Sequence, residues 1–180
     1  EFSNMLMNAF TEAKSIGLTT HINPDGDGLC TCLALKKVLS GLGLKADLVV
    51  DDANLDRFNF LDIGVEITLN NPALEYDLLV IIDLHDNSRL GDREHLAEKA
   101  GKIVVIDHHE IENDLIECDF CWIDSSAVCT GWMLYKLFEH LIKAMAEADR
   151  IYVGTCLYTT LLNDTNNFTN ANTDVHAYEF

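Results

Sequence analysis

Short apolar runs alternate along the chain with longer segments in which apolar residues recur at helical spacing. The runs 78–82 and 103–106 contain only branched apolar residues, which is typical of strands buried on both faces of a parallel sheet. The pattern predicts strands over 18–22, 47–50, 76–83, 102–107 and 118–123, and helices over 3–16, 30–42, 55–63, 92–100, 126–142 and 147–162. Because strands and helices alternate, we predict an α/β fold, a doubly wound and mainly parallel sheet flanked by helices.

Ligand-type side chains follow three of these predicted strands. They are His21, Asp25 and Asp27 after the first strand, Asp83 after the third, and Asp107, His108 and His109 after the fourth. The last long helix runs into Asp164, a further carboxylate. The carboxyl ends of parallel strands meet at one edge of a sheet, where ligands bind in open α/β folds. We therefore expect these side chains to converge there.

Each of these residues has an ordinary structural explanation when it is taken alone. A single Asp at a strand end is more often a turn or helix cap, and a single His is more often a satisfied polar group. We interpret His85, His95, His140 and His176 in that way. The convergence of four separate segments on one edge instead favours a metal site.

The net charge of the chain restricts the kinds of partner that it can bind. The formal net charge is −18, from 12 Lys and Arg against 30 Asp and Glu. A sequence-independent grip on long nucleic acid needs dense positive charge, so we expect no long duplex as a partner. No apolar run approaches the length of a membrane span and no signal peptide is visible, so we expect a cytoplasmic protein without a membrane partner. Formation of a homo-oligomer stays open.

The cysteines leave two interpretations. Cys30 with Cys32, and Cys118 with Cys121, are spaced as pairs that could hold zinc. We favour the simpler view that they are free thiols and that 118–123 is a buried strand, because free Cys is among the most buried residue types.

The ordered motifs resemble those of the DHH phosphoesterase family. They are His21-Ile22-Asn23-Pro24-Asp25-Gly26-Asp27, then Asp83, then Asp107-His108-His109, then Asp164-Thr165 ahead of Phe168. Ser88-Arg89-Leu90-Gly91 and Ser125-Ser126-Ala127 add smaller matches. The family includes RecJ-like exonucleases, NrnA-like oligoribonucleases and pAp phosphatases, cyclic dinucleotide phosphodiesterases, exopolyphosphatases and related pyrophosphatases.

The resemblance implies a site with two metal ions. His21, Asp25 and Asp83 would hold one ion, and Asp83 would bridge to a second ion held by Asp27, His108 and Asp164. Carboxylates and imidazoles without a thiolate suit Mn²⁺ or Mg²⁺ better than zinc. Two such ions about 3.5–4 Å apart can activate a hydroxide for an in-line displacement at phosphorus.

Further roles follow from the same resemblance. We expect Asp83, Asp107, His108 and His109 to be catalytic, with Asp107 orienting an imidazole. Asn23, Arg89 and His109 are candidate substrate contacts, Arg89 because its guanidinium matches two phosphate oxygens, although a surface or capping salt bridge explains Arg89 equally well.

Two stretches depart from the family pattern. Gly28-Leu29-Cys30-Thr31 stands where many members have Ala-x-Gly-Ser, so we expect a wider loop or a differently packed helix there. Asn166-Asn167-Phe168-Thr169 stands where Gly-x-Phe-Arg is usual, which removes one candidate phosphate contact. Both departures bear on substrate choice and leave the metal ligands intact.

We thus expect a manganese-dependent phosphoesterase acting on short anionic substrates such as oligonucleotides, pAp or dinucleotides. Residues 1–180 would be its catalytic domain, with the family's second, substrate-binding domain missing from this chain. The alternatives are an inorganic pyrophosphatase or exopolyphosphatase, and a non-catalytic binding module with the same fold.

Overall fold

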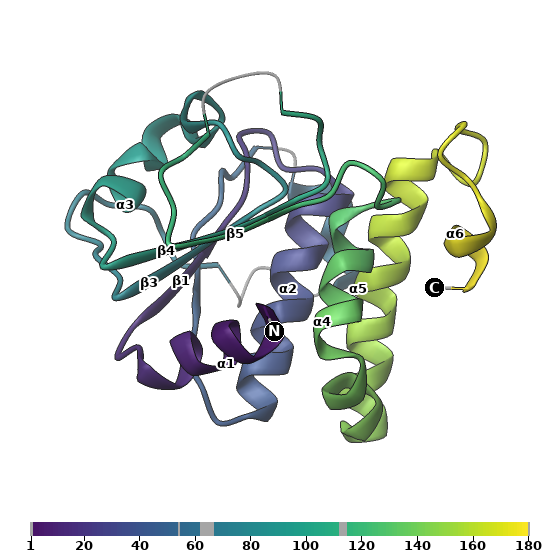
Figure 1. Cartoon of the computed structure of the whole chain (residues 1–180), viewed down its shortest axis with the longest axis horizontal. Helices are drawn as coiled ribbons and strands as arrows, with labels where there is room; N and C mark the ends of the chain where they lie inside the picture. Colours follow the sequence, from purple (N-terminus) through teal and green to yellow (C-terminus); the bar gives the residue numbers. More distant parts are fainter. Residues whose placement is uncertain (1, 54, 62–66, 112–114, 180) are drawn as a thin grey trace.

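The computed structural model describes residues 2–53, 55–61, 67–111 and 115–179 of the chain (Figure 1). The strands are β1 (Ile16–Thr19), β2 (Asp47–Leu48), β3 (Leu78–Ile82), β4 (Lys102–Asp107) and β5 (Phe120–Ile123). The α-helices are α1 (Phe2–Glu12), α2 (Gly26–Gly41), α3 (Glu94–Lys99), α4 (Thr130–Ala144), α5 (Glu147–Thr165) and α6 (Val175–Glu179). Two 3-10 helices cover Leu55–Leu61 and Asn87–Arg93.

The described strands form one parallel sheet in the order β2-β1-β3-β4-β5. The chain adds β2 on one side of β1 and then returns to add β3, β4 and β5 on the other side. The crevice at the carboxyl ends of β1 and β3 is therefore the switch point of the sheet, where doubly wound folds bind ligands. The predicted fold class is confirmed.

Strand β3 shows how the sheet is buried on both faces. Leu78, Val80 and Ile82 belong to the larger core that includes buried residues of α1, α2, α4 and α5. Leu79 and Ile81 belong to the smaller core on the other face, next to α3. Successive side chains of a strand point to opposite faces, so a continuous apolar run is what two covered faces require. Figure 1 shows the four helices on one side of the sheet and α3 on the other.

Element boundaries differ from the prediction at the places that position the candidate site. Strand β1 ends at Thr19 rather than at residue 22, and α2 begins at Gly26 rather than at residue 30. Asp25 caps α2, because its side chain accepts hydrogen bonds from the backbone N–H groups of Asp27 and Gly28. Such a cap is worth about 0.5–2 kcal/mol. The predicted short helix over 55–63 is present to Leu61, and its last two residues lie outside the described residues.

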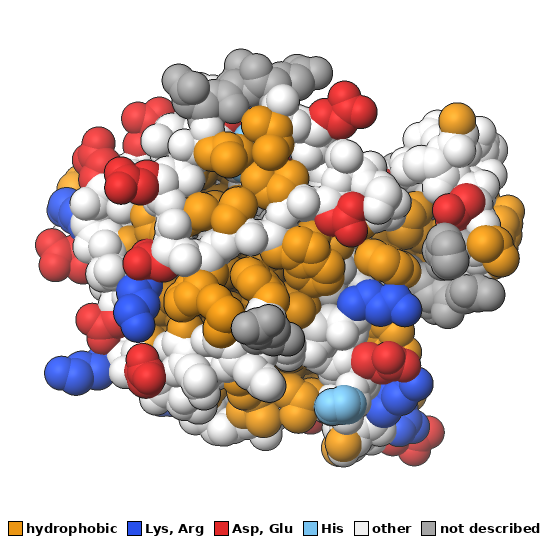
Figure 2. All heavy atoms as spheres, in the orientation of Figure 1, with side chains coloured by type: hydrophobic (Ala, Val, Ile, Leu, Met, Phe, Trp, Pro, Cys, Tyr) orange, Lys and Arg blue, Asp and Glu red, His pale blue; other side chains and the backbone are white. Residues whose placement is uncertain are grey.

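The edge strand β5 is less buried than its apolar sequence predicts. Phe120 and Trp122 are half-buried and Cys121 is exposed, so the expectation of a buried strand is wrong here. Figure 2 shows hydrophobic side chains gathered across the middle of the face that β5 borders, with acidic side chains spread around them. None of the described helices is long and apolar enough to cross a lipid bilayer.

Candidate metal centre

The predicted ligands come together at the switch point of the sheet. His21 lies in the loop after β1, Asp83 directly follows β3, and His108 directly follows β4. Asp25 and Asp27 lie at the start of α2, and Asp164 lies in the last turn of α5. The parallel strands and the two helix ends thus deliver six side chains from five segments to one edge.

Asp83 occupies the centre of this arrangement. Its backbone φ is 66°, in the left-handed region that is uncommon for a residue other than Gly and costs about 1–3 kcal/mol. Two contacts hold it there. Its backbone N–H donates to the carbonyl oxygen of Ile106 at 2.8 Å, and Thr130 Oγ1 donates to Asp83 Oδ1 at 2.9 Å. The strained turn aims the buried carboxylate at the imidazoles on either side.

The first group consists of His21, Asp25 and Asp83. His21 Nε2 lies 3.5 Å from Asp83 Oδ2 and 3.6 Å from Asp25 Oδ1. The other ring nitrogen, Nδ1, lies 2.8 Å from the carbonyl oxygen of Ile22. A carbonyl only accepts, so Nδ1 carries the proton and Nε2 faces the two carboxylates. His21 is 5% exposed, and Nε2 is buried without a hydrogen-bond partner.

The second group consists of Asp27, His108 and Asp164, and it shares Asp83 with the first. His108 Nε2 lies 2.8 Å from Asp164 Oδ2, 3.4 Å from Asp27 Oδ2 and 3.6 Å from Asp83 Oδ1. His108 Nδ1 points to the carbonyl oxygen of Ala127 at 3.3 Å. Nε2 is buried and lacks hydrogen-bond geometry to any of the three carboxylates. One oxygen of Asp83 therefore faces each imidazole.

The amino end of α4 holds Asp27 in place. The backbone N–H groups of Thr130 and Gly131 donate to Asp27 at 2.7 and 3.1 Å. The N-cap residue Cys129 makes no side-chain cap, so Asp27 satisfies these N–H groups from another helix. Thr130 thereby contacts both Asp27 and Asp83. Sequence reasoning missed this residue, because it placed the helix start at residue 126 and so left Thr130 inside the helix.

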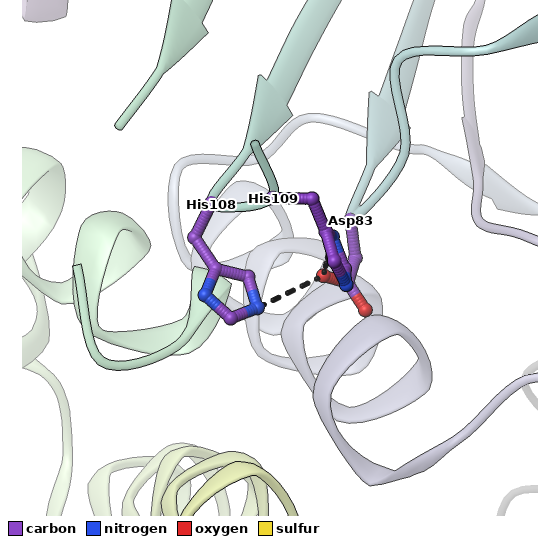
Figure 3. A group of neighbouring side chains, drawn as sticks. All are labelled: Asp83, His108 and His109. Atoms are coloured by element: carbon purple, nitrogen blue, oxygen red, sulfur yellow. Dashed lines mark ion pairs between the residues drawn. The ribbon is translucent and has the colours of Figure 1, made fainter. Parts of the chain in front are cut away.

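His109 projects from the same turn as His108 toward the same carboxylate (Figure 3). Its side chain is 43% exposed, and its Nδ1 lies 2.7 Å from Asp107 Oδ1 and 3.5 Å from Asp83 Oδ1. The other oxygen of Asp107 accepts a short hydrogen bond from His85 Nδ1. Asp107 thus joins two imidazoles. His85 was interpreted as an ordinary polar residue, and its position two residues after Asp83 is the only sequence signal for this contact.

The two remaining predicted substrate residues border the site through their backbones. Asn23 has a φ of 49°, and its N–H donates to Asp51 Oδ2 at 2.9 Å. The carbonyl oxygen of Arg89 accepts from the N–H of Ile22 at 2.8 Å, which ties the Asn87–Arg93 helix to the loop after β1. The Arg89 side chain is half-buried. Substrate contacts by Asn23 and Arg89 stay predictions.

The protonation of the group reflects its crowded charges. Burial disfavours charged imidazoles, but the neighbouring carboxylates outweigh it and raise the pKa of His21 to about 10 and that of His108 to about 9. Burial and the Asp83 and Asp164 carboxylates raise the pKa of Asp27. Burial likewise raises the pKa of Asp83. The metal-free site thus favours bound protons, which a cation would replace.

The residues fit a pair of hard divalent cations. Two buried imidazole nitrogens without hydrogen-bond partners face carboxylate oxygens, and both rings are oriented through their other nitrogen by a backbone carbonyl. Asp83, His108 and His109 form a third close group, which shares two members with the others. Since Nδ1 of His109 is engaged by Asp107, we assign His109 no metal of its own.

Both departures from the family pattern have physical explanations. Residues 28–31 lie inside α2 and are buried, so the loop is not wider. A Cβ at Gly28 would lie 2.2 Å from Thr20 Oγ1, so a side chain here would force Thr20 or the start of α2 to shift. Asn166, Asn167 and Phe168 have φ values of 47°, 56° and 64°. Asn tolerates this left-handed region, which explains how it replaces a Gly after α5.

The fold and the site define a parallel α/β domain with a candidate centre for two metal ions. The model of the DHH family, N-terminal domain, matches residues 15–160. The chain therefore belongs to the DHH family of phosphoesterases.

Similar proteins cover nearly all of the chain. It is 29% identical over 181 residues to the cyclic-di-AMP phosphodiesterase GdpP of Geobacillus thermodenitrificans, an alignment covering 93% of this chain and 27% of that protein. It is 25% identical over 163 residues to the bifunctional oligoribonuclease and PAP phosphatase NrnA of Bacillus subtilis, covering 88% of this chain and 49% of NrnA. The chain thus spans between about a quarter and a half of the length of these relatives.

A solved structure supports the same fold. The crystal structure of an exopolyphosphatase-related protein from Bacteroides fragilis superposes with a TM-score of 0.82 at 19% identity. The match covers 99% of this chain and 54% of that one.

Proposed function

We propose that this chain is the catalytic domain of a divalent-metal phosphoesterase that hydrolyses short phosphate-containing substrates. The observation that carries the proposal is the shared Asp83, whose two oxygens face the imidazoles of His21 and His108. The relatives support the substrate class, since one is a cyclic-di-AMP phosphodiesterase and another an oligoribonuclease and PAP phosphatase. Oligonucleotides, pAp and dinucleotides are accordingly the proposed substrates.

The six ligands would hold two ions, for which we propose Mn²⁺ with Mg²⁺ as the alternative. His21, Asp25 and Asp83 would hold one, and Asp27, His108 and Asp164 would join Asp83 around the other. When bound, such ions supply Lewis-acid stabilisation of phosphoryl charge and acidify water. Thr130 orients Asp83 and Asp27 for this purpose through its hydroxyl and its backbone N–H.

His109 would act on the substrate. The carboxylate of Asp107 raises the pKa of His109, and His109 Nδ1–H donates to Asp107, so the second ring nitrogen is free for the substrate. From an exposed position beside Asp83, this nitrogen can donate to a phosphoryl or leaving-group oxygen. His85 holds the other oxygen of Asp107 and so fixes the carboxylate that orients His109.

The charge of the chain favours short substrates. With a net charge of −18, this domain has little positive potential for a long polyanion, so we propose neither a long duplex nor a membrane as a partner. Metal ions, His109, Asn23 and Arg89 would instead contact a substrate of one or a few nucleotides. Because the chain spans about half of NrnA, we expect the chain alone to turn over slowly.

The test compares hydrolysis of pAp, a linear dinucleotide, a cyclic dinucleotide and pyrophosphate by the manganese-loaded chain. We expect hydrolysis of the nucleotide substrates, and its loss in Asp83→Ala. Asp149→Asn is the matched control, because this half-exposed carboxylate lies at the opposite end of α5 and forms an ion pair with Lys37. Full activity in Asp83→Ala would contradict the assignment. Hydrolysis of pyrophosphate alone would replace the proposal with a pyrophosphatase, and failure to bind manganese would favour a binding module.

A further inference from the structure

Asn163 joins the two candidate metal groups. It lies in the last turn of α5, and its Nδ2 donates to Asp25 Oδ2 at 3.3 Å and to Asp164 Oδ1 at 3.0 Å. Asp25 belongs to the group with His21, and Asp164 to the group with His108. One neutral carboxamide therefore bonds a carboxylate of each group. Among the described residues, we find no other side chain that donates hydrogen bonds to both of these aspartates.

The bonds leave the metal-facing oxygen of Asp164 free. Asn163 takes Asp164 Oδ1, whereas Oδ2 lies 2.8 Å from His108 Nε2. In the other group, Asp25 Oδ1 accepts hydrogen bonds from the backbone N–H groups of Asp27 and Gly28, and Asp25 Oδ2 accepts one from Asn163 Nδ2. Asn163 Nδ2 is thus a hydrogen-bond donor shared by two carboxylates that repel each other, and it fixes the orientation of both.

Helices α2 and α5 pack closely at the place where Asn163 makes these bonds. The Oδ1 atom of Asn163 accepts the backbone N–H of Gly26 at 3.0 Å. A Cβ at Gly26 would lie 2.9 Å from Asn163 Cβ, so the absence of a side chain there lets the ends of α2 and α5 meet. Asn163 thereby fastens the first turn of α2, which carries Asp27, to the last turn of α5, which carries Asp164.

We propose that Asn163 is a positioning residue that sets the separation of the two metal groups, so that both ions bind together with a fixed spacing. We assign it no contact with substrate or reacting atoms. It acts through Asp25 and Asp164, which it ties to each other across α2 and α5. This inference rests on the proposed function only in that two ions must bind.

The test is a manganese titration of the chain followed by electron paramagnetic resonance. The signal of free Mn²⁺ gives the number of ions bound and both dissociation constants, and the low-temperature spectrum reports magnetic coupling between neighbouring ions. We expect two coupled ions in the wild-type chain. In Asn163→Leu, which removes the hydrogen bonds at similar volume, we expect the weaker constant to rise at least tenfold and the coupled spectrum to change.

Two further variants complete the experiment. If Asn163→Leu does not fold, Asn163→Ser, a small polar change at an exposed position, takes its place. We expect the same rise of the weaker constant and the same change of the coupled spectrum. Thr159→Ala, one turn earlier on α5 and with its hydroxyl donating to the carbonyl oxygen of Thr155, should keep both constants and the coupling. A merely structural role of Asn163 would lower thermal stability without altering the coupled spectrum.

The outcomes separate this inference from the proposed function. If the wild-type chain binds two coupled ions and the Asn163 variants do the same with unchanged constants, the positioning role is overturned and the proposed function stands. If the wild-type chain binds fewer than two ions, both are overturned.

Discussion

At the scale of single residues, the site gathers buried carboxylates and imidazoles that bind protons in the absence of a cation. Asp27 and Asp83 are buried carboxylates with raised pKa values, and His21 and His108 are buried imidazoles with raised pKa values. The sequence predicted the placement of these groups, because strand ends of a parallel sheet meet at one edge. It could not predict Thr130, whose contact with Asp83 joins residues 47 positions apart.

The raised pKa values predict how the metal-free chain responds to pH. An imidazole with a raised pKa stabilises the fold fully below its ordinary pKa of 6.5, and this contribution is lost as the pH rises toward about 9 for His108 and about 10 for His21. The raised pKa values of Asp27 and Asp83 likewise make the fold less stable as the pH rises. We expect the melting temperature of the metal-free chain to fall above about pH 6.5, and the increase caused by manganese to grow over the same range, because metal binding displaces protons.

Thermal unfolding with and without manganese, at several pH values from about 6 to about 9, measures both effects. His108→Gln should remove much of the pH dependence, and His140→Gln, at an exposed position of α4, should retain it. A metal-free chain that gains stability over this range would contradict the pKa assignments.

At the scale of elements, the site depends on how closely α2 approaches β1 and where α5 ends. The hydrophobic pattern predicted both helices, since their apolar positions face the larger core. It misplaced the start of α2, because residues 18–22 suggested a longer strand and Asp25 was assigned as a ligand but not as a cap. Pattern alone also gave no reason for Gly28, whose role depends on a neighbour in another element.

Gly28→Ala tests the approach of α2 to β1. The added methyl would lie 2.2 Å from Thr20 Oγ1 and 3.3 Å from Asp83 Oδ2, so we expect a loss of about 1–3 kcal/mol in the free energy of unfolding. Thr20→Ala should reduce this loss when the two changes are combined. Gly154→Ala is the control, because its added Cβ, in the middle of α5, would meet no described atom within 4 Å beyond the backbone of its own helix, and it should stabilise the chain by about 0.5–1 kcal/mol. Urea unfolding gives the free energy of unfolding of Gly28→Ala, Thr20→Ala, the double variant and Gly154→Ala. Equal effects of the two glycine substitutions would refute the steric argument.

Asn166→Ala tests the end of α5. Asn166 has φ 47° and ψ 58°, and its Nδ2 donates to Thr169 Oγ1 at 3.0 Å. Ala disfavours this left-handed conformation, so we expect a loss of about 1–2 kcal/mol, whereas Asn166→Gly should cost less. The same urea experiment compares the two variants, and a Gly variant less stable than the Ala variant would contradict the argument from the left-handed backbone.

At the scale of the whole molecule, the chain is a strongly acidic DHH-family domain with six candidate metal ligands at the switch point of its sheet. The order of the motifs in the sequence was sufficient to predict the family, and the alternation of apolar strands with helices was sufficient to predict the fold. The substrate does not follow from this domain, since its relatives are two to four times longer and differ in what they hydrolyse. What the chain itself defines is the pair of candidate metal groups around Asp83.

Manganese binding to the wild-type chain and to Asp83→Asn tests this central claim most directly. Asn keeps the size of the side chain and tolerates the left-handed backbone at this position, so the variant removes the charge without the strain of another residue. The measurement is equilibrium dialysis followed by elemental analysis. We predict two manganese ions per wild-type chain and binding weakened by roughly a hundredfold in Asp83→Asn. Two ions bound by Asp83→Asn with wild-type affinity, or fewer than two by the wild-type chain, would contradict a centre built on Asp83.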